Sequence, residues 1–324
     1  MVHTRGEALG LRTRHRPRGS GGATRPVAGP SRRRTPAWWR RQATPWLYLL
    51  VPLALLVAFT YIPVGDMLQW SFTDWDGISP TYKGVGLRNY QTIFSDPDYY
   101  HTFFVSLYYL AASVVQLALA LYFATILSFN TRFRNVFKGI LFFPYLLNGV
   151  AVGYVFLYVF QPHGILDSTL KVFGYHNTHL WLGSSTWVNP SLAGVSVWRF
   201  MGLNMVLFLG AIQSINPELY EATEIDGANR WHQFRYIIAP SIRPLLSLSM
   251  ILAISGSLAV FEIPFIMTGG AGASRTFVIQ SQAEAFHYNK LGLASAFGIT
   301  LLLIVLLITW VQRLLLPDEK VDLI

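Results

Sequence analysis

Residues 220–228 have the sequence Tyr-Glu-Ala-Thr-Glu-Ile-Asp-Gly-Ala, a polar, helix-forming segment that lies between two long apolar runs. Asn216 is a favourable N-cap, and Pro217 suits the first helical position. Gly227 accepts the positive φ at which many helices end. The sequence therefore predicts a short helix that begins at Pro217 and ends at Asp226.

A second helix is expected to begin at Ala228 and to end at Pro240. Trp231, Phe234 and Ile237 recur there at helical spacing. Proline interrupts a regular helix because it has no N–H to donate. Two helices joined by a turn make this gap far longer than two adjacent spans need. We expect the helix pair to lie in water beneath the membrane, where a partner can contact it.

The composition around this segment identifies lipid as the solvent. The chain of 324 residues is 52% hydrophobic and only 13% charged, which is unlike a soluble globular domain. Six apolar stretches are long enough to cross a hydrocarbon core of roughly 30 Å. They are residues 46–64, 103–129, 137–160, 192–212, 245–263 and 292–311. The sequence thus predicts an all-α polytopic membrane protein with six transmembrane helices and no spanning sheet.

The net charge of +9 arises in the N-terminal head. Residues 1–43 contain eleven Arg and no Lys against the single acid Glu7, so the rest of the chain is close to neutral and offers no basic groove for nucleic acid. A head rich in Arg, Pro and Gly buries too little apolar surface to fold and is predicted to be disordered. Anionic membrane lipid is its expected partner.

Lys and Arg also set the expected orientation. They are concentrated in the head, in the gaps 130–136 and 213–244, and in the C-terminal tail, and such residues accumulate on the cytoplasmic side. Both termini are therefore expected in the cytoplasm, which six crossings allow. The expected organisation is a cytoplasmic head (1–43), a membrane domain (44–316) and a cytoplasmic tail (317–324).

Several kinds of chemistry are excluded by what the sequence lacks. There is no cysteine, so disulfides and thiolate sites are absent. His176 and His179 have no third ligand nearby, so we expect a solvated loop and no metal site. No Gly-Lys dipeptide occurs, which rules out the phosphate-binding loop G-x-x-x-x-G-K-[ST]. We expect no catalytic residue and no cofactor in this chain, and any nucleotide must be hydrolysed by another one.

A few residues inside the predicted spans stand out. Arg199 and Glu262 are ionisable groups near span ends, where they either snorkel to the interface or line a translocation path. Gly149 and Gly153 form a G-x-x-x-G pair that permits close helix contact. Pro144 is one of the prolines expected to kink or end a helix.

The central loop and three further motifs resemble one family of transport proteins. In the loop, the residues that carry the resemblance are Glu221, Ala222, Thr223, Asp226, Gly227, Ala228, Phe234, Ile237 and Pro240. The other motifs are Ser71-Phe72-Thr73-Asp74-Trp75, Leu87-Arg88-Asn89-Tyr90, and Phe261-Glu262-Ile263-Pro264 with Thr268-Gly269-Gly270. From about residue 46 to residue 316, the chain resembles the inner-membrane permeases of binding-protein-dependent ABC importers. The likeness is closest to the carbohydrate-uptake branch, which includes the maltose- and glycerol-phosphate-type permeases.

This resemblance implies an ABC importer type I-like permease fold in the bacterial inner membrane, with cytoplasmic coupling helices. It implies two copies of a cytoplasmic ATPase that use the ATP, a second permease subunit that shares the path, and an extracytoplasmic sugar-binding protein. Glu221, Ala222, Asp226 and Gly227 correspond to the docking and turn residues of the family's EAA loop. The chain departs from the family pattern at Thr223, where Ala is more frequent, and at Ala239, where Leu commonly precedes the proline.

Two alternatives remain open at the level of sequence. An importer of the same superfamily for an amino acid, peptide or phosphate would share the cytoplasmic loop, and only the outer motifs favour carbohydrate. A self-contained secondary carrier is disfavoured because its spans usually contain more ionisable groups than these do.

Overall fold

The computed structural model describes residues 37–129, 132–175 and 179–315. These residues form helices and loops without a strand, and an isolated bridge joins Thr73 to Gly84. Most of the Arg-rich head (1–36) and the predicted tail (317–324) lie outside the described residues, as does His176.

The chain divides into two units, Met1–Leu56 and Val57–Ile324. The described part of the first unit is helix α1 (Ala37–Leu56). This helix begins seven residues before the end of the predicted head (1–43). Residues 37–43 contain no Gly or Pro and lead directly into an apolar run, and a helix extends readily through such residues once it is nucleated.

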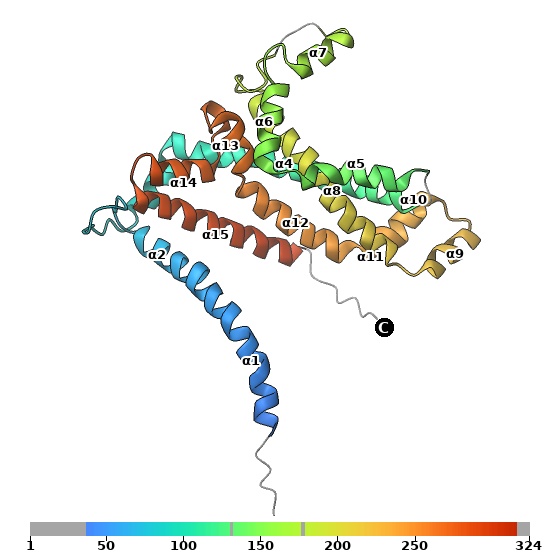
Figure 1. Ribbon diagram of the computed structural model, residues 1–324, viewed down its shortest axis with the longest axis horizontal. Helices are drawn as coiled ribbons and strands as arrows, with labels where there is room; N and C mark the ends of the chain where they lie inside the picture. The colour runs from blue at the N-terminus through green and yellow to red at the C-terminus, as the bar shows by residue number, and fades with distance from the viewer. Residues whose placement is uncertain (1–36, 130–131, 176–178, 316–324) are drawn as a thin grey trace, which may run out of the picture. The chain divides into compact units, whose positions relative to one another are not determined.

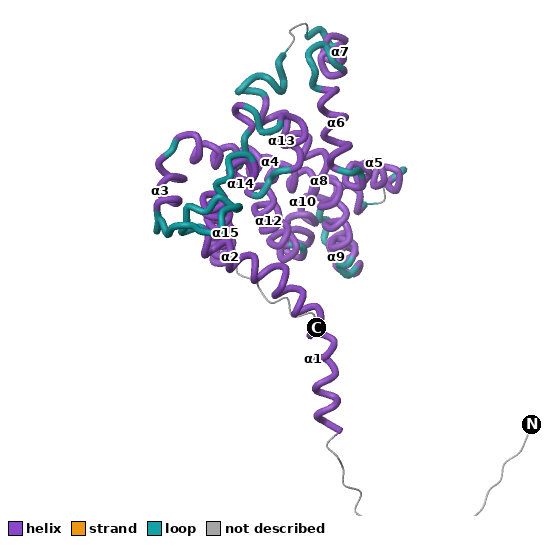
Figure 2. The backbone as a smooth tube through the Cα atoms, turned by 60° about the vertical axis from the view of Figure 1, so that its left-hand side comes forward, coloured by secondary structure: helices purple, strands orange, loops and turns teal. Residues whose placement is uncertain are grey.

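The second unit contains the remaining helices (Figures 1 and 2). Up to the central loop they are the π-helix η1 (Val57–Tyr61), α2 (Ile62–Trp70), α3 (Arg88–Ser95), α4 (Pro97–Ser128), α5 (Arg134–Leu146), α6 (Gly149–Val159), α7 (Ile165–Val172) and α8 (Val188–Gln213). From the loop onwards they are α9 (Pro217–Ile225), α10 (Arg230–Gln233), the π-helix η2 (Phe234–Ile238), α11 (Ala239–Ser241), α12 (Arg243–Leu258), α13 (Glu262–Thr268), the 3₁₀ helix η3 (Gly272–Ser274), α14 (Phe277–Phe286) and α15 (Leu291–Leu315).

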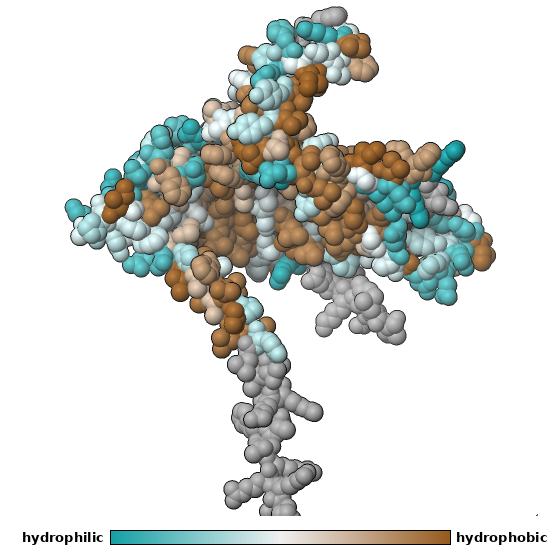
Figure 3. Space-filling model, viewed as in Figure 1, coloured by the Kyte–Doolittle hydropathy of each residue, from teal (hydrophilic) through white to brown (hydrophobic). Residues whose placement is uncertain are grey.

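Five helical segments are long and apolar enough to cross a membrane. They are Tyr48–Trp70, Pro97–Ser128, Val188–Gln213, Arg243–Thr268 and Leu291–Leu314. Each overlaps a predicted span, and the number becomes six when α5 and α6 are taken as one broken span. Figure 3 shows apolar side chains over the middle of the second unit and polar ones gathered towards its ends, as expected for a surface in contact with lipid.

The third predicted span, 137–160, is not one continuous helix. Helix α5 ends at Leu146, α6 begins at Gly149, and the two axes differ by 99°. Pro144 weakens the last turn of α5, and the Asn148 side chain accepts hydrogen bonds from the Val150 and Ala151 amides at 2.9 and 3.4 Å. Asn148 is therefore the N-cap of a new helix. The predicted span is broken close to Pro144, one of the prolines expected to kink or end a helix.

Helices α4 and α8 form the centre of the second unit and run in parallel. Leu127 and Ile212, in their last turns, belong to one buried apolar cluster. Tyr109 and Val188, nearer their starts, belong to a second cluster. Figure 1 shows α9–α11 at the end of the unit where α8 finishes, and α13 and α14 towards the other end. The central loop therefore lies at one end of the bundle, and the three further motifs (71–75, 87–90 and 261–264 with 268–270) lie towards the other end (Figure 1).

Glycines allow the close helix contacts that the sequence predicts. A β-carbon at Gly153 would overlap Ile266, and one at Gly149 would overlap the Glu262 carboxylate, so the G-x-x-x-G face of α6 packs on α13. In α8, a β-carbon at Gly202 would overlap the Leu141 carbonyl oxygen of α5. Here the backbones themselves touch, as small residues permit in membrane helices.

Hydrogen bonds hold the loop between α2 and α3. The Asn89 side chain donates to the Ser71 and Thr73 carbonyls at 2.9 and 2.8 Å, and the Tyr90 hydroxyl donates to Ser71 Oγ at 2.7 Å. The Gly292 amide donates to the Trp75 carbonyl at 2.8 Å. Two of the outer motifs are therefore bonded to each other, which gives the loop a fixed shape without a disulfide.

We predict that Gly202→Ala destabilises the protein while Gly210→Ala does not. The new methyl group at 202 meets the α5 backbone, whereas one at 210 meets nothing within 4 Å. Overpacking of this kind costs about 1–3 kcal/mol, and alanine favours a helix by about 1 kcal/mol over glycine. Thermal unfolding in detergent should show a melting temperature lowered by several degrees for Gly202→Ala only. Equal melting temperatures for the two variants would contradict the α5–α8 contact.

Candidate functional site

The first half of the central loop folds as the sequence predicts. Asn216 Oδ1 accepts a hydrogen bond from the Glu218 amide at 3.1 Å, and α9 begins at Pro217. After α9, Gly227 has φ +73°. The Gly227 amide donates to the Glu224 carbonyl at 3.1 Å and the Ala228 amide to the Thr223 carbonyl at 2.9 Å. This pair of bonds is a Schellman motif, so main-chain atoms close the turn.

The second half of the loop differs from the prediction. Asn229 caps α10, so the helix begins at Arg230 and not at Ala228. Pro240 does not end it, because the wider π-helical turn η2 precedes the proline and the Ile242 amide still donates to the Ile238 carbonyl at 3.0 Å. A π-turn changes the hydrogen-bonding partners, so a missing N–H need not break the helix. The loop therefore runs almost without interruption into α12.

The inner face of the loop is buried in the protein core. Ile238 and Ile242 are fully buried in the apolar cluster formed by the last turns of α4 and α8, and Phe234 and Tyr220 pack against its edge. Burial raises the pKa of the Tyr220 hydroxyl, because an apolar environment disfavours the charged form. The loop is thus held to the bundle from the inside.

Thr223, the position that departs from the family pattern, connects the two halves of the loop. Its hydroxyl donates to the Tyr220 carbonyl at 2.8 Å and accepts from Gln233 Nε2 at 3.3 Å. Gln233 is itself buried. An alanine at 223 would lack this bond, so the threonine adds a direct link between α9 and α10.

The outer face of the loop is exposed. Glu221, Ala222, Asp226 and Gly227 are all exposed, Ala228 is half-buried and Pro240 is exposed. Ile225, which sequence reasoning did not select, is 87% exposed at the end of α9. The signal in the sequence was an isoleucine that directly follows the polar run 221–224 and precedes the turn at Asp226-Gly227. The loop also exposes Leu219, Trp231 and Tyr236, so apolar and aromatic side chains lie among its acidic residues, and aromatic residues are enriched where proteins contact each other.

The structure brings together the two intramembrane charges. Arg199 Nη1 in α8 and Glu262 Oε2 at the start of α13 are 2.5 Å apart, although the residues are 63 positions apart in the chain. The Arg199 side chain is 12% exposed and that of Glu262 is 44% exposed. Pairing of this kind is what a charge at membrane depth requires.

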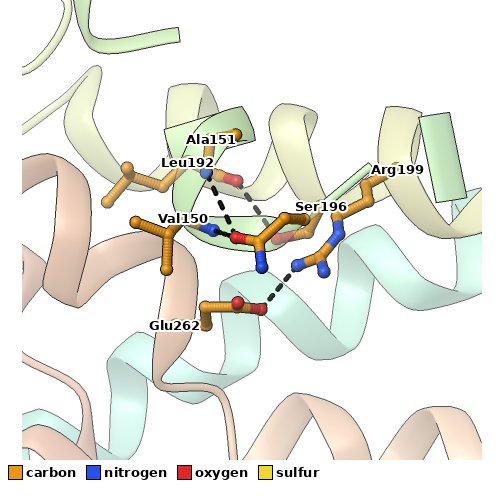
Figure 4. A network of polar contacts seen from close by, with 7 residues as sticks. Val150, Ala151, Leu192, Ser196, Arg199 and Glu262 are labelled. Carbon is orange, nitrogen blue, oxygen red and sulfur yellow. Dashed lines mark hydrogen bonds and ion pairs between the residues drawn. The ribbon is translucent and has the colours of Figure 1, made fainter. Parts of the chain in front are cut away.

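The ion pair lies where two interrupted helices meet (Figure 4). Glu262 is the first residue of α13 and contacts Gly149, the first residue of α6. Helix N-termini carry partial positive charge, which favours a carboxylate there. Three elements therefore converge at Glu262: α8 through Arg199, α6 through Gly149, and α13 itself.

The two helices that adjoin the loop lead to the ion pair. Arg199 is on α8, whose C-terminal end leads into α9, and Glu262 follows α12, which begins just after the loop. Helix α12 has 16 residues, about 24 Å at the rise of a regular helix. A displacement of the loop would therefore act on both partners of the ion pair. Among residues 37–129, 132–175 and 179–315, no group of three His, Asp or Glu side chains could hold a metal ion.

Comparison with known proteins agrees with this architecture. The family described as binding-protein-dependent transport system inner membrane component matches residues 116–321. The diacetylchitobiose uptake system permease protein NgcF of Streptomyces coelicolor is 33% identical over 271 residues, which cover 78% of this chain and 76% of NgcF. The arabinooligosaccharides transport system permease protein AraP of Bacillus subtilis is 30% identical over 315 residues, which cover 90% of this chain and 95% of AraP.

Solved structures show the same fold. A bacterial ABC transporter involved in the import of the acidic polysaccharide alginate aligns with a TM-score of 0.76 at 20% identity, over 87% of this chain and 99% of the matched chain. A bacterial alginate ABC transporter in complex with an alginate pentasaccharide-bound periplasmic protein aligns with a TM-score of 0.74 at 20% identity, over 86% of this chain and 96% of that one.

The fold and the matching family define a multi-pass membrane component of a transport system. The chain belongs to the family of inner membrane components of binding-protein-dependent transport systems, the permeases of ABC importers. The predicted family and the predicted helical permease fold are therefore confirmed.

We predict that Arg199→Gln and Glu262→Gln each lower the melting temperature, and that the double variant loses less than the sum of the two. Either single change leaves a partly buried charge without its partner, which is worse than removing both. A double-mutant cycle on the purified protein in nanodiscs should give a coupling energy of about 0.5–3 kcal/mol. Strictly additive effects would show that the two charges act independently.

Proposed function

We propose that this chain is a permease subunit of an ATP-driven importer of mono- or oligosaccharides, moved through its central loop by a cytoplasmic ATPase. The observation that carries the proposal is a loop that is held to the core on one face and exposed on the other. Such an arrangement passes a displacement of the loop on to the bundle, because Ile238 and Ile242 cannot shift without moving the ends of α4 and α8.

The proposed mechanism is mechanical. The ATPase contacts the exposed face of α9 around Glu221, Ile225 and Asp226 and displaces the helix pair as it closes. The displacement passes along α8 and α12 to Arg199 and Glu262, where interrupted helices meet. Discontinuous helices near the middle of a membrane protein are common at substrate and gating sites of transporters, so we assign this ion pair to the translocation path.

The proposed partners follow from the same arrangement. This chain supplies no phosphate-binding loop, so ATP is bound and hydrolysed by two copies of an ATPase and this chain is non-catalytic. A second permease subunit completes the path, and a binding protein delivers the solute to the outer face. The name of the family supports the last partner, as does a solved relative in complex with a periplasmic protein.

Carbohydrate is the proposed cargo. It is supported by the saccharides in the names of two relatives that match most of the chain and by the outer motifs. An importer of the same type for another solute is the alternative. A secondary carrier is disfavoured, since the described spans contain few ionisable groups and these include a mutually paired Arg and Glu. The distribution of Lys and Arg supports cytoplasmic termini.

We expect Gly227→Val to abolish uptake while Gly227→Asn retains most of it. Valine at φ +73° is strained by at least about 1–2 kcal/mol and opens the Schellman turn, whereas asparagine tolerates this conformation. The measurement is ATP-dependent accumulation of maltotriose, cellotriose, arabinotriose and chitotriose by proteoliposomes that contain the complete importer.

Membrane insertion of both Gly227 variants is the control, because no atom lies within 4 Å of a β-carbon there. Normal uptake by Gly227→Val would refute the coupling role. Sugar flux through liposomes that contain this chain alone would favour the carrier.

A second experiment uses the absence of cysteine from the chain. Ile225→Cys and Ile78→Cys replace two isoleucines that are 87% and 77% exposed at opposite ends of the second unit. A membrane-impermeant maleimide should label Ile78→Cys from outside intact cells and Ile225→Cys only in inverted vesicles. Bound ATPase should then protect Ile225→Cys from labelling. Labelling of Ile225→Cys from outside would reverse the orientation, and labelling unaffected by the ATPase would exclude docking at this face.

A further inference from the structure

A polar cavity lies at the end of the second unit opposite the central loop. It has a volume of about 720 Å³ and lies between the first turns of α4, the turn around η3, and α14. Neither Arg199 nor Glu262 lines it, so it is separate from the ion pair. Its volume is in the range of small-molecule binding pockets.

Two buried acceptors in the cavity wall lack hydrogen-bond partners among the described residues. They are Oε2 of Glu284, a residue only 2% exposed, and Oδ1 of Asn189, which is 3% exposed. The carboxylate forms a long ion pair with Lys290, whose Nζ is 3.6 Å from Oε2, and this contact is not a hydrogen bond. Buried acceptors of this kind cost free energy unless a donor reaches them. Both would be satisfied by a molecule that donates O–H groups.

Hydrogen bonds fix the two acceptors in place. Glu284 Oε1 accepts from the Tyr99 hydroxyl at 3.1 Å and from Gln280 Nε2 at 2.7 Å. Asn189 Nδ2 donates to the Ala273 carbonyl at 2.9 Å, which leaves its oxygen free. Side chains held in this way pre-organise a site and reduce the entropic cost of binding.

The remaining lining fits an uncharged polyhydroxyl ligand. Three acidic side chains (Asp96, Asp98 and Glu284) and two cationic ones (Arg275 and Lys290) line the cavity, so their charges almost cancel. Arg275 is held by bonds to the Gly270 carbonyl and to Gln280 Oε1 at 3.1 and 3.2 Å. Phe104 and Tyr108 on α4 add exposed aromatic surface, which can cover the apolar face of a sugar ring. Acceptors, donors and rings together suit a saccharide better than an ion.

The cavity lies at the N-terminal end of α4, a helix longer than one membrane crossing requires. Helix α4 has 32 residues, about 48 Å, against a hydrocarbon thickness of roughly 30 Å. Its first turns, with Asp96 as N-cap and Asp98 and His101 nearby, are polar. A ligand would therefore meet this cavity at the mouth of the bundle.

We propose that this cavity is an entry site that binds one or more sugar units of the incoming saccharide, with Glu284 and Asn189 as acceptors for its hydroxyl groups. The proposal rests on carbohydrate being the cargo. It assigns to this chain a direct part in recognising the substrate, outside the ion pair and the central loop.

The test is binding of maltotriose, cellotriose, arabinotriose and chitotriose to the complete importer in nanodiscs, without ATP and without the binding protein. Saturation-transfer NMR detects weak binding and supplies the dissociation constants. We expect at least one trisaccharide to bind. Glu284→Gln and Asn189→Leu should each weaken its binding by about tenfold or more, since each removes an acceptor from a ligand hydroxyl. The matched controls Glu218→Gln and Asn204→Leu lie outside the cavity and should leave binding unchanged.

Ser185→Trp provides a variant that does not disturb the buried network. Ser185 is exposed and lines the cavity, so the indole should block the ligand even if the buried substitutions prevent insertion. If none of the four trisaccharides binds the wild-type importer, or if Ser185→Trp binds as the wild type does, the proposal is overturned.

The proposal and the proposed function fail in different ways. If Ser185→Trp takes up sugar with an unchanged half-saturating concentration, the entry-site proposal is rejected and the proposed importer function stands. In the opposite case, the wild-type importer binds a trisaccharide, Ser185→Trp abolishes this binding, and none of the four sugars is accumulated. The entry-site proposal then stands and carbohydrate as the transported substrate is rejected. The Gly227→Val variant should bind the trisaccharide normally, because the central loop is at the other end of the bundle.

Discussion

Hydrocarbon offers no hydrogen bonds, so a chain can interrupt a helix within it only where the protein itself supplies partners for the freed backbone groups. The second unit has such interruptions between α5 and α6 and between α12 and α13. Asn148 caps the first, and Glu262 begins the helix after the second. Because Glu262 contacts Gly149 and pairs with Arg199, the two interruptions support each other. The packing of α6 on α13 and the placement of both beside α8 depend on this meeting point.

The central loop, at the other end of the bundle, is also held by contacts that the protein itself supplies. Its turn is closed by main-chain bonds, its inner face is buried, and Thr223 joins its two helices through Gln233. A loop held in this way is expected to move as one rigid body. The helix that enters the loop, α8, contains Arg199, and the helix that leaves it, α12, ends four residues before Glu262, so packed structure connects the loop with the ion pair.

Hydropathy alone located the spans, because a lipid environment leaves a helix few options. The start and end of α9 were also predictable, since Asn216 and Gly227 act through local backbone chemistry. Proline was an uncertain guide. Pro144 lies close to the break before Asn148, as expected, whereas Pro240 is accommodated by a π-helical turn and does not end its helix. The Arg199–Glu262 pair joins residues 63 positions apart, and the cavity around Glu284 is assembled from α4, α8, η3 and α14. No spacing in a single sequence reveals such sites.

The Schellman turn has a consequence for how the exposed face of α9 can change. Main-chain amides and carbonyls and the glycine hold the turn. The side chains of Glu221, Glu224 and Ile225 therefore take no part in closing it. Their identities can be exchanged without loosening the scaffold beneath them. The exposed face of α9 is therefore a place where the sequence can be varied while the fold of the loop is kept.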